Sequence, residues 1–219
     1  MAVAYDNSTA SSWASSSRSS HTFAHTVTGS DPVLLVGLGT FNSTGGSKTS
    51  GVTYGGVAMT FVATLEIQGN TFIDLYKLVN PATGSNNVVL TFSSAQSFGW
   101  INATSYTGAG DPNVSVTKKS TGSSPTTVTL TTLTDNSWLA MYAFDNSSNN
   151  AAGAGTTERT DSGRGAAMDS NSAKSPAGSY SLAFSHNSPA SAGAIMVAIP
   201  ESGGGPPAAS QNSNFLKFM

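Results

Sequence analysis

The sequence predicts an all-β fold, a single antiparallel β-sandwich that is jelly-roll-like and carries an extended C-terminal tail. Short apolar or alternating runs recur between clusters of Gly, Asn, Pro and Ser, which is typical of sandwiches and barrels. No window places apolar residues at helical spacing over three turns, and the helix formers Glu, Lys and Arg are scarce. The 219 residues suit one large all-β domain, so we assign 1–200 to the sandwich and 201–219 to a linker and tail.

The elements are expected in a regular order along the chain. Residues 1–20 are predicted to form an irregular N-terminal segment, because 8–20 is rich in Ser. The region 145–177 is predicted to be a long loop with short strands near 156–159 and 165–169. We detect no internal repeat of fixed period. The expected strands are 21–28, 32–41, 51–63, 71–79, 87–92, 98–106, 114–118, 126–133, 138–144, 179–185 and 193–199.

Two patterns indicate where these strands lie in the sandwich. Val128 and Leu130 alternate with threonines, as expected of a strand with one buried face and one wet face. The runs 33–36 and 195–197 are continuously apolar and suit central strands. Gly55-Gly56 marks a bulge or a tight two-residue turn, and Pro81 ends its strand because it cannot donate to a sheet.

Composition and charge exclude several classes of protein. Only 9% of the residues are charged, against roughly 25% in an ordinary soluble domain. The net charge is −2 and the sequence has no basic stripe, so no nucleic-acid partner is expected. Cysteine is absent, which removes disulfides and thiolate metal sites. The first residues do not resemble a secretory signal, and no apolar run is long enough to cross a bilayer, so no membrane partner is expected.

The sequence shows no motif for catalysis, for a cofactor or for a metal. His21 and His25 lie four residues apart, about 13 Å along a strand, too far to share one metal without help from elsewhere. Asp135-Asn136 and Asp145-Asn146 could offer oxygens to Ca²⁺ but lack the EF-hand spacing. No Gly-x-Ser-x-Gly elbow or phosphate loop appears. We therefore predict no catalytic residue, no metal ligand and no cofactor.

The aromatic residues leave two alternatives open. Trp100 and Tyr106 share one strand at even spacing, and Trp138 lies on another. Such rings could form a stacking platform for a glycan, beside amide and carboxylate hydrogen-bonding groups. The same three rings could instead anchor the core of the sandwich.

The C-terminal residues combine a linker with an apolar segment. Gly and Pro in 201–214 cannot sustain a helix or a central strand, so this stretch has no fold of its own. A segment without a core of its own becomes ordered on something outside it. We therefore expect the residues that follow the linker to dock on a neighbour, and the partner-binding residues are Phe215, Leu216, Phe218 and Met219.

Three consecutive segments carry a resemblance to a known group of domains. Residues 50–61 read Ser-Gly-Val-Thr-Tyr-Gly-Gly-Val-Ala-Met-Thr-Phe, 74–84 read Asp-Leu-Tyr-Lys-Leu-Val-Asn-Pro-Ala-Thr-Gly, and 87–92 read Asn-Val-Val-Leu-Thr-Phe. This stretch resembles β-sandwich domains, jelly-roll-like, of phage virion surface proteins and bacterial surface proteins. The pattern contains no catalytic residue, so the resemblance implies a structural or binding role.

We expect a non-enzymatic structural protein of a phage virion, a capsid decoration protein or a component of a tail or fibre, assembled through its C-terminal tail. Its partners would be other virion proteins or copies of itself, and it would be made in the host cytoplasm. The alternative is a carbohydrate-binding or adhesion module, used for host attachment on a virion or displayed on a bacterial surface. A hydrolase is a third possibility that no motif supports.

Overall fold

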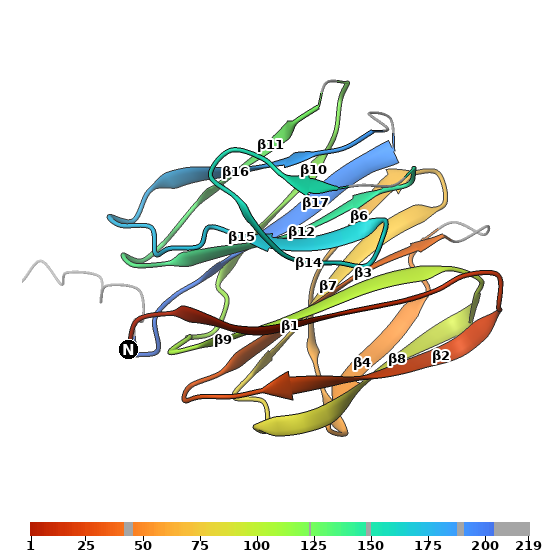
Figure 1. Cartoon of the computed structure of the whole chain (residues 1–219), viewed down its shortest axis with the longest axis horizontal. Helices are drawn as coiled ribbons and strands as arrows, with labels where there is room; N and C mark the ends of the chain where they lie inside the picture. Colours follow the sequence, from red (N-terminus) through yellow and green to blue (C-terminus); the bar gives the residue numbers. More distant parts are fainter. Residues whose placement is uncertain (42–45, 123, 148–149, 188–190, 204–219) are drawn as a thin grey trace, which may run out of the picture.

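The computed structural model describes residues 1–41, 46–122, 124–147, 150–187 and 191–203. The predicted all-β, antiparallel sandwich architecture is confirmed, because every strand pair is antiparallel and the described residues form no α-helix. In this part of the chain no helix could span a membrane. Four sheets are stacked in layers rather than the two of a single sandwich (Figure 1).

The first half of the chain forms two of these sheets. The first inner sheet has the order β1-β9-β3-β7-β6, and the first outer sheet has the order β2-β8-β4-β5. The strands are β1 (Ala4–Trp13), β2 (Arg18–Val27), β3 (Val33–Phe41), β4 (Thr49–Tyr54), β5 (Val57–Ala58), β6 (Thr60–Gln68), β7 (Thr71–Val79), β8 (Gly84–Gln96) and β9 (Gly99–Thr107).

The second half forms the other two sheets. The second inner sheet has the order β10-β17-β12-β15-β14, and the second outer sheet has the order β11-β16-β13. The strands are β10 (Val114–Lys119), β11 (Thr126–Thr131), β12 (Trp138–Asp145), β13 (Ala151–Ala152), β14 (Thr157–Asp161), β15 (Gly165–Asp169), β16 (Ser179–Ser185) and β17 (Ala192–Ile199).

The two halves have the same topology. When β1 is matched to β10, β2 to β11, β3 to β12 and so on, with β5 as the one strand that has no counterpart, both inner sheets have one strand order and both outer sheets have another. Each half is thus a jelly-roll-like sandwich in its own right. The repeat is one of topology, which explains why no fixed period was visible in the sequence.

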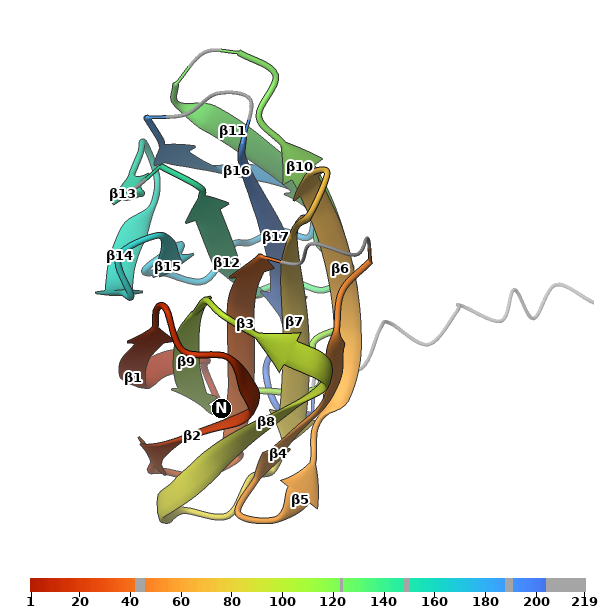
Figure 2. The same cartoon turned by 90° about the vertical axis from the view of Figure 1, so that its right-hand side faces the viewer.

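The four layers can be followed in the side view of Figure 2. Three hydrophobic cores fill the spaces between them. The first core lies between the first outer and first inner sheets and contains Leu34, Leu90 and Ile101. The third core lies between the second inner and second outer sheets. The central core joins the two inner sheets, and it contains Leu35, Leu75, Tyr142, Phe144, Ile195 and Val197. The two sandwiches therefore share one continuous hydrophobic interface.

The burial of each strand explains its sequence pattern. β3, β12 and β17 are continuously apolar because they lie inside inner sheets that are covered on both faces. β11 alternates between buried and exposed residues, as its Thr/Val/Leu pattern predicted. β14 and β15 coincide closely with the short strands expected inside 145–177.

Two expectations about the first half were wrong in detail. The Ser-rich N-terminal segment is not irregular, because β1 pairs with β9 along nearly its whole length and lies at the edge of its sheet, where small polar side chains are tolerated. The run 51–63 is also not one strand. Gly55-Gly56, where both glycines have positive φ, form the expected turn between β4 and β5. A second interruption at Met59 separates β5 from β6.

Candidate functional site

The three aromatic residues considered for glycan stacking all belong to the central core. Tyr106 and Trp138 contact each other with ring centroids 6.2 Å apart, and Tyr106 is fully buried. Trp100 is 9% exposed, and the Arg164 guanidinium lies 4.9 Å from its ring centroid. None of the three rings presents an open face to a sugar. Their burial favours the other alternative, in which they anchor the core.

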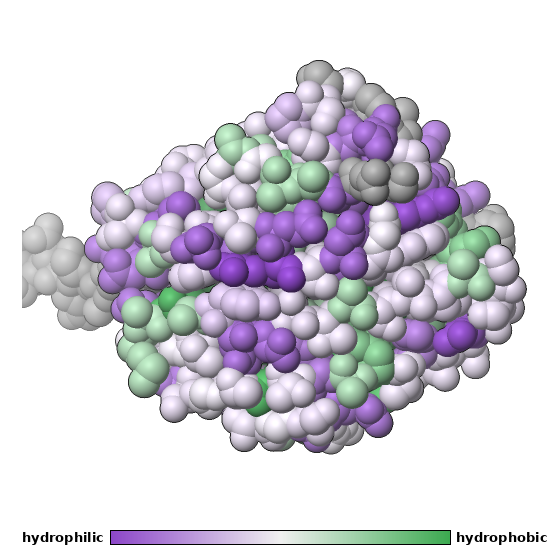
Figure 3. Space-filling view, in the orientation of Figure 1, coloured by the Kyte–Doolittle hydropathy of each residue, from purple (hydrophilic) through white to green (hydrophobic). Residues whose placement is uncertain are grey.

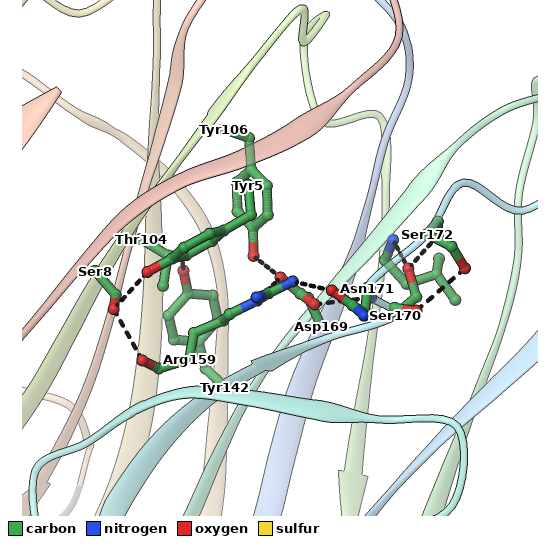
Figure 4. A network of polar contacts seen from close by, with 11 residues as sticks. Tyr5, Ser8, Thr104, Tyr106, Tyr142, Arg159, Asp169, Ser170, Asn171 and Ser172 are labelled. Carbon is green, nitrogen blue, oxygen red and sulfur yellow. Dashed lines mark hydrogen bonds and ion pairs between the residues drawn. The ribbon is translucent and has the colours of Figure 1, made fainter. Parts of the chain in front are cut away.

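A buried polar network crosses the interface between the two inner sheets (Figure 4). Arg159 on β14 donates from Nε to the Asp169 carboxylate on β15 at 2.7 Å, and the Asp169 side chain is completely buried. The Tyr106 hydroxyl on β9 donates to the same carboxylate at 3.3 Å. The Arg159 guanidinium also lies over the ring of Tyr5 on β1, 4.2 Å from its centroid.

The electrostatics of this network favour the protonated forms of Tyr106 and Arg159. Burial raises the pKa of the Tyr106 hydroxyl, and the Asp169 charge raises it further, so the phenol keeps its proton and donates it. Burial alone would lower the pKa of Arg159, but its bond to Asp169 outweighs this effect and raises it. The Tyr106 phenol and the Arg159 guanidinium thus keep their protons, and the network fastens two strands of the first half to two of the second.

The two histidines of β2 line a second polar seam, between β2 and the neighbouring edge strand β1. His25 is 2.9 Å from the Thr9 hydroxyl through Nδ1 and 3.2 Å from the Ser105 hydroxyl through Nε2. His21 is 2.8 Å from the Ser11 hydroxyl. Burial lowers the pKa of His25 to about 4, although the Asp6 charge opposes this shift. Each of the two imidazole rings thus forms hydrogen bonds with hydroxyl groups of neighbouring strands.

Asp6, Ser105 and His25 form a chain of hydrogen bonds, but not in the order of a hydrolase triad. The Ser105 hydroxyl donates to the Asp6 carboxylate at 2.6 Å, so the serine lies between the acid and the histidine. Ser105 is also completely buried, which leaves a substrate no access to its oxygen. The chain stabilises the junction of β1, β2 and β9.

The acidic residues considered for calcium have backbone partners. Asp135 accepts a hydrogen bond from the amide of Ala177 at 2.6 Å, and Asp145 accepts one from the amide of Asn187 at 2.7 Å. These carboxylates stabilise loops by accepting hydrogen bonds from backbone amides. Among the described residues no three His, Cys, Asp or Glu side chains gather closely enough to hold a metal ion.

The end of the described chain is held firmly against the loop that joins the two halves. Gly110 donates from its amide to the carbonyl of Pro200 at 2.7 Å, and Ser202 donates from its amide to the carbonyl of Gly108 at 2.9 Å. The Ser202 hydroxyl also donates to Asp31 at 2.9 Å. The proposed partner-binding residues Phe215, Leu216, Phe218 and Met219 lie outside the described residues.

The surface combines little charge with a few exposed apolar side chains. The face shown in Figure 3 is mostly pale, with small separate hydrophilic and hydrophobic areas. The large exposed hydrophobic residues of the described chain are Met1, Val57, Phe61 and Leu133. Val57 and Ala58 on β5 and Phe61 on β6 are all exposed, and we call this group of apolar residues the β5–β6 corner. The sequence did not reveal it, because an apolar residue in a strand does not show by itself whether it is covered.

Comparison with known proteins gives no relative. No family model, no curated protein and no solved structure matches this chain.

Proposed function

We propose that this chain is a non-enzymatic structural protein of a phage virion, a capsid decoration protein or part of a tail or fibre, which is assembled through its C-terminal tail. One observation carries the proposal: β17 is an inner strand of a doubly covered sheet, and the residues that follow it are hydrogen-bonded to the 108–111 loop. A peptide that leaves such a strand is joined to a well-ordered body, so a partner that holds the peptide tethers the whole molecule.

The chemistry of the body supports an assembly role. Its polar networks are directed inward and join the layers, as the Arg159–Asp169 pair shows. The small net charge and low charge density limit repulsion between copies, so copies can pack densely. Other virion proteins and copies of this chain are the partners that this proposal names, and synthesis in the host cytoplasm is part of it.

A carbohydrate-binding or adhesion role is the second candidate, and a groove at the end of the first outer sheet favours it. Thr53, Ser85, Asn86 and Asn87 line this groove beside the Gly55-Gly56 turn. Hydroxyl and amide groups of this kind can hydrogen-bond a sugar. Saturable binding in a glycan array, lost on substitution of Asn87 by Ala, would support this role, and an array without signal would remove it.

Truncation after Ser202 tests the assembly role. All three cores lie within residues 3–199, so the truncated chain should fold and remain soluble. It should fail to join particles or assemblies that the full chain enters, as measured by co-sedimentation. Normal incorporation of the truncated chain would contradict the proposal.

A further inference from the structure

We propose that the β5–β6 corner is the receiving surface for the C-terminal segment 215–219 of a neighbouring copy of this chain. This inference rests on the proposed assembly through the tail and names the surface that the tail would bind. The contacts would be heterologous, because the tail of one copy and the corner of the next are different surfaces.

The corner presents exposed apolar side chains, and its aromatic ring is supported from one side. Val57 is 56% exposed and Phe61 is 51% exposed, whereas Met59 between them is buried in the first core. The Phe61 ring packs edge-to-face on Tyr76, with centroids 5.5 Å apart. One side of the ring is thus supported by the protein while half of the side chain remains open. A preorganised aromatic ring of this kind is a suitable anchor for a partner's apolar side chains.

The strands that carry the corner have unpaired edges. In the described part of the chain β6 pairs with β7 alone, and β5 pairs with β4 alone. An extended peptide can add to such an edge through backbone hydrogen bonds, while its side chains enter the adjacent apolar surface. A five-residue segment can use both kinds of contact at once.

The tail begins near the corner. Thr60 at the start of β6 pairs with Lys77, and the Lys77 ammonium bonds to Asp111 at 2.5 Å and to the carbonyl of Pro112 at 2.7 Å. The same loop holds Pro200 through Gly110. Both ends of the proposed contact therefore lie at one end of the molecule. Residues 204–214 can span roughly 36–40 Å when extended, which is enough to cross to an adjacent copy.

The composition of the tail fits the corner. Phe215 and Phe218 can pack edge-to-face with Phe61, and Met219 offers a sulfur that interacts well with aromatic rings. Lys217 is the one charged residue of 215–219, and Glu66 is the one charged residue of β6 and is exposed. The opposite signs favour a tail that runs along β6.

Complementation between two full-length variants tests the proposal. Phe61→Ser removes the corner and keeps the tail, whereas Phe218→Ser keeps the corner and removes an anchor of the tail. By sedimentation velocity the unaltered chain should show concentration-dependent association, and each variant alone should associate at least tenfold more weakly. An equimolar mixture of the two should form one-to-one dimers, because one intact tail then meets one intact corner. Leu133→Ser is the matched control, since Leu133 is also 51% exposed, and it should associate like the unaltered chain.

Each other outcome has a defined meaning. If Phe61→Ser associates normally while Phe218→Ser does not, the corner is not the receiving surface, but assembly through the tail stands. If both variants associate normally, the tail is not used and the proposed function is also contradicted. If the unaltered chain associates but the mixture remains monomeric, the tail of one copy does not bind the corner of another, and the inference is overturned. An unaltered chain that does not self-associate would overturn the inference and leave a different protein as the tail's partner.

Discussion

Gly37 of β3 lies directly against the aromatic ring of Tyr142 of β12, across the interface between the two inner sheets. A Cβ atom on Gly37 would overlap the Cδ1 and Cγ atoms of that ring, and the neighbouring Gly39 has the same relationship to Phe144. β3 and β12 occupy equivalent places in the two halves. The two glycines of β3 therefore leave the space that the two rings of β12 occupy. This fit favours one arrangement of the two halves.

Substitution of Gly37 by Ala should destabilise the whole molecule. The added methyl group has no space unless the ring of Tyr142 moves, and an overpacked core costs about 1–3 kcal/mol. Urea unfolding should show this loss in a single transition. Gly51→Ala is the matched control, because its nearest neighbour would be the Thr91 hydroxyl at 3.4 Å, an ordinary contact. Equal stability of the two variants would contradict the tight fit.

Substitution of Asp169 by Asn should also weaken the joint between the halves. It leaves Arg159 without its buried partner and the Tyr106 hydroxyl without a charged acceptor, at a cost of about 3 kcal/mol. Asp111→Asn breaks the ion pair with Lys77, in which the Asp111 side chain is 64% exposed. Since such pairs contribute at most about 1 kcal/mol, thermal unfolding should separate the two variants clearly. Comparable losses would mean that the buried pair has no special role.

Much of the architecture was predictable, because the order of apolar and polar residues within one strand indicates which of its faces are buried. The alternation of Val128 and Leu130 with threonines predicted a strand with one exposed face, and the continuous apolar run 33–36 predicted a strand covered on both faces. The burial of β11 and β3 agrees with both predictions. The glycines at 55 and 56 marked a turn that the structure places between β4 and β5.

The doubling of the sandwich was not predictable from such local signals. A residue such as Trp138 is apolar whether it faces the outer sheet of its own half or the inner sheet of the other half. The sequence pattern therefore does not show how many sheets are stacked. The N-terminal strand was missed for a related reason. β1 is stabilised by pairing with β9 and by bonds such as Thr9 to His25, which join residues distant in the sequence.

Acid should destabilise the protein through His25. Its pKa is about 4 in the folded state, against an ordinary value of 6.5. Between these two pH values the histidine is protonated in the unfolded chain but mostly neutral in the folded chain. The contribution of neutral His25 to the free energy of unfolding is fully present above about pH 6.5. It decreases as the pH falls below this value and is lost once the pH is below about 4. The expected loss is about 2–3 kcal/mol between pH 7 and pH 4.5, at about 1.4 kcal/mol per pKa unit.

Replacement of His25 by Gln tests the origin of this loss. The amide of Gln can still meet the hydroxyls of Thr9 and Ser105 but does not titrate, so urea unfolding of the variant should depend less on pH in this window. The pKa of Asp6 is lowered, because hydrogen bonds from Ser105 and Thr28 outweigh the effect of burial. Its contribution is lost only as the pH falls below about 3.8, outside the measured range. An unchanged pH dependence would assign the acid effect to other groups.

The two halves should depend on each other to fold, although each has the topology of a complete sandwich. Separation between Gly110 and Asp111 would expose the central core, including Leu35 and Leu75 on one fragment and Tyr142 on the other. An apolar face of this size is not tolerated in water, so fragments 1–110 and 111–203 should aggregate when expressed singly. Expressed together, they should co-purify as a one-to-one complex in which the interface is restored. Phe144→Asp in the second fragment should abolish the complex, because it places a charge against Gly39 in the shared core, whereas Leu133→Ser at the surface should not. A first fragment that is monomeric and unfolds cooperatively by itself would show that the central interface joins two independent domains.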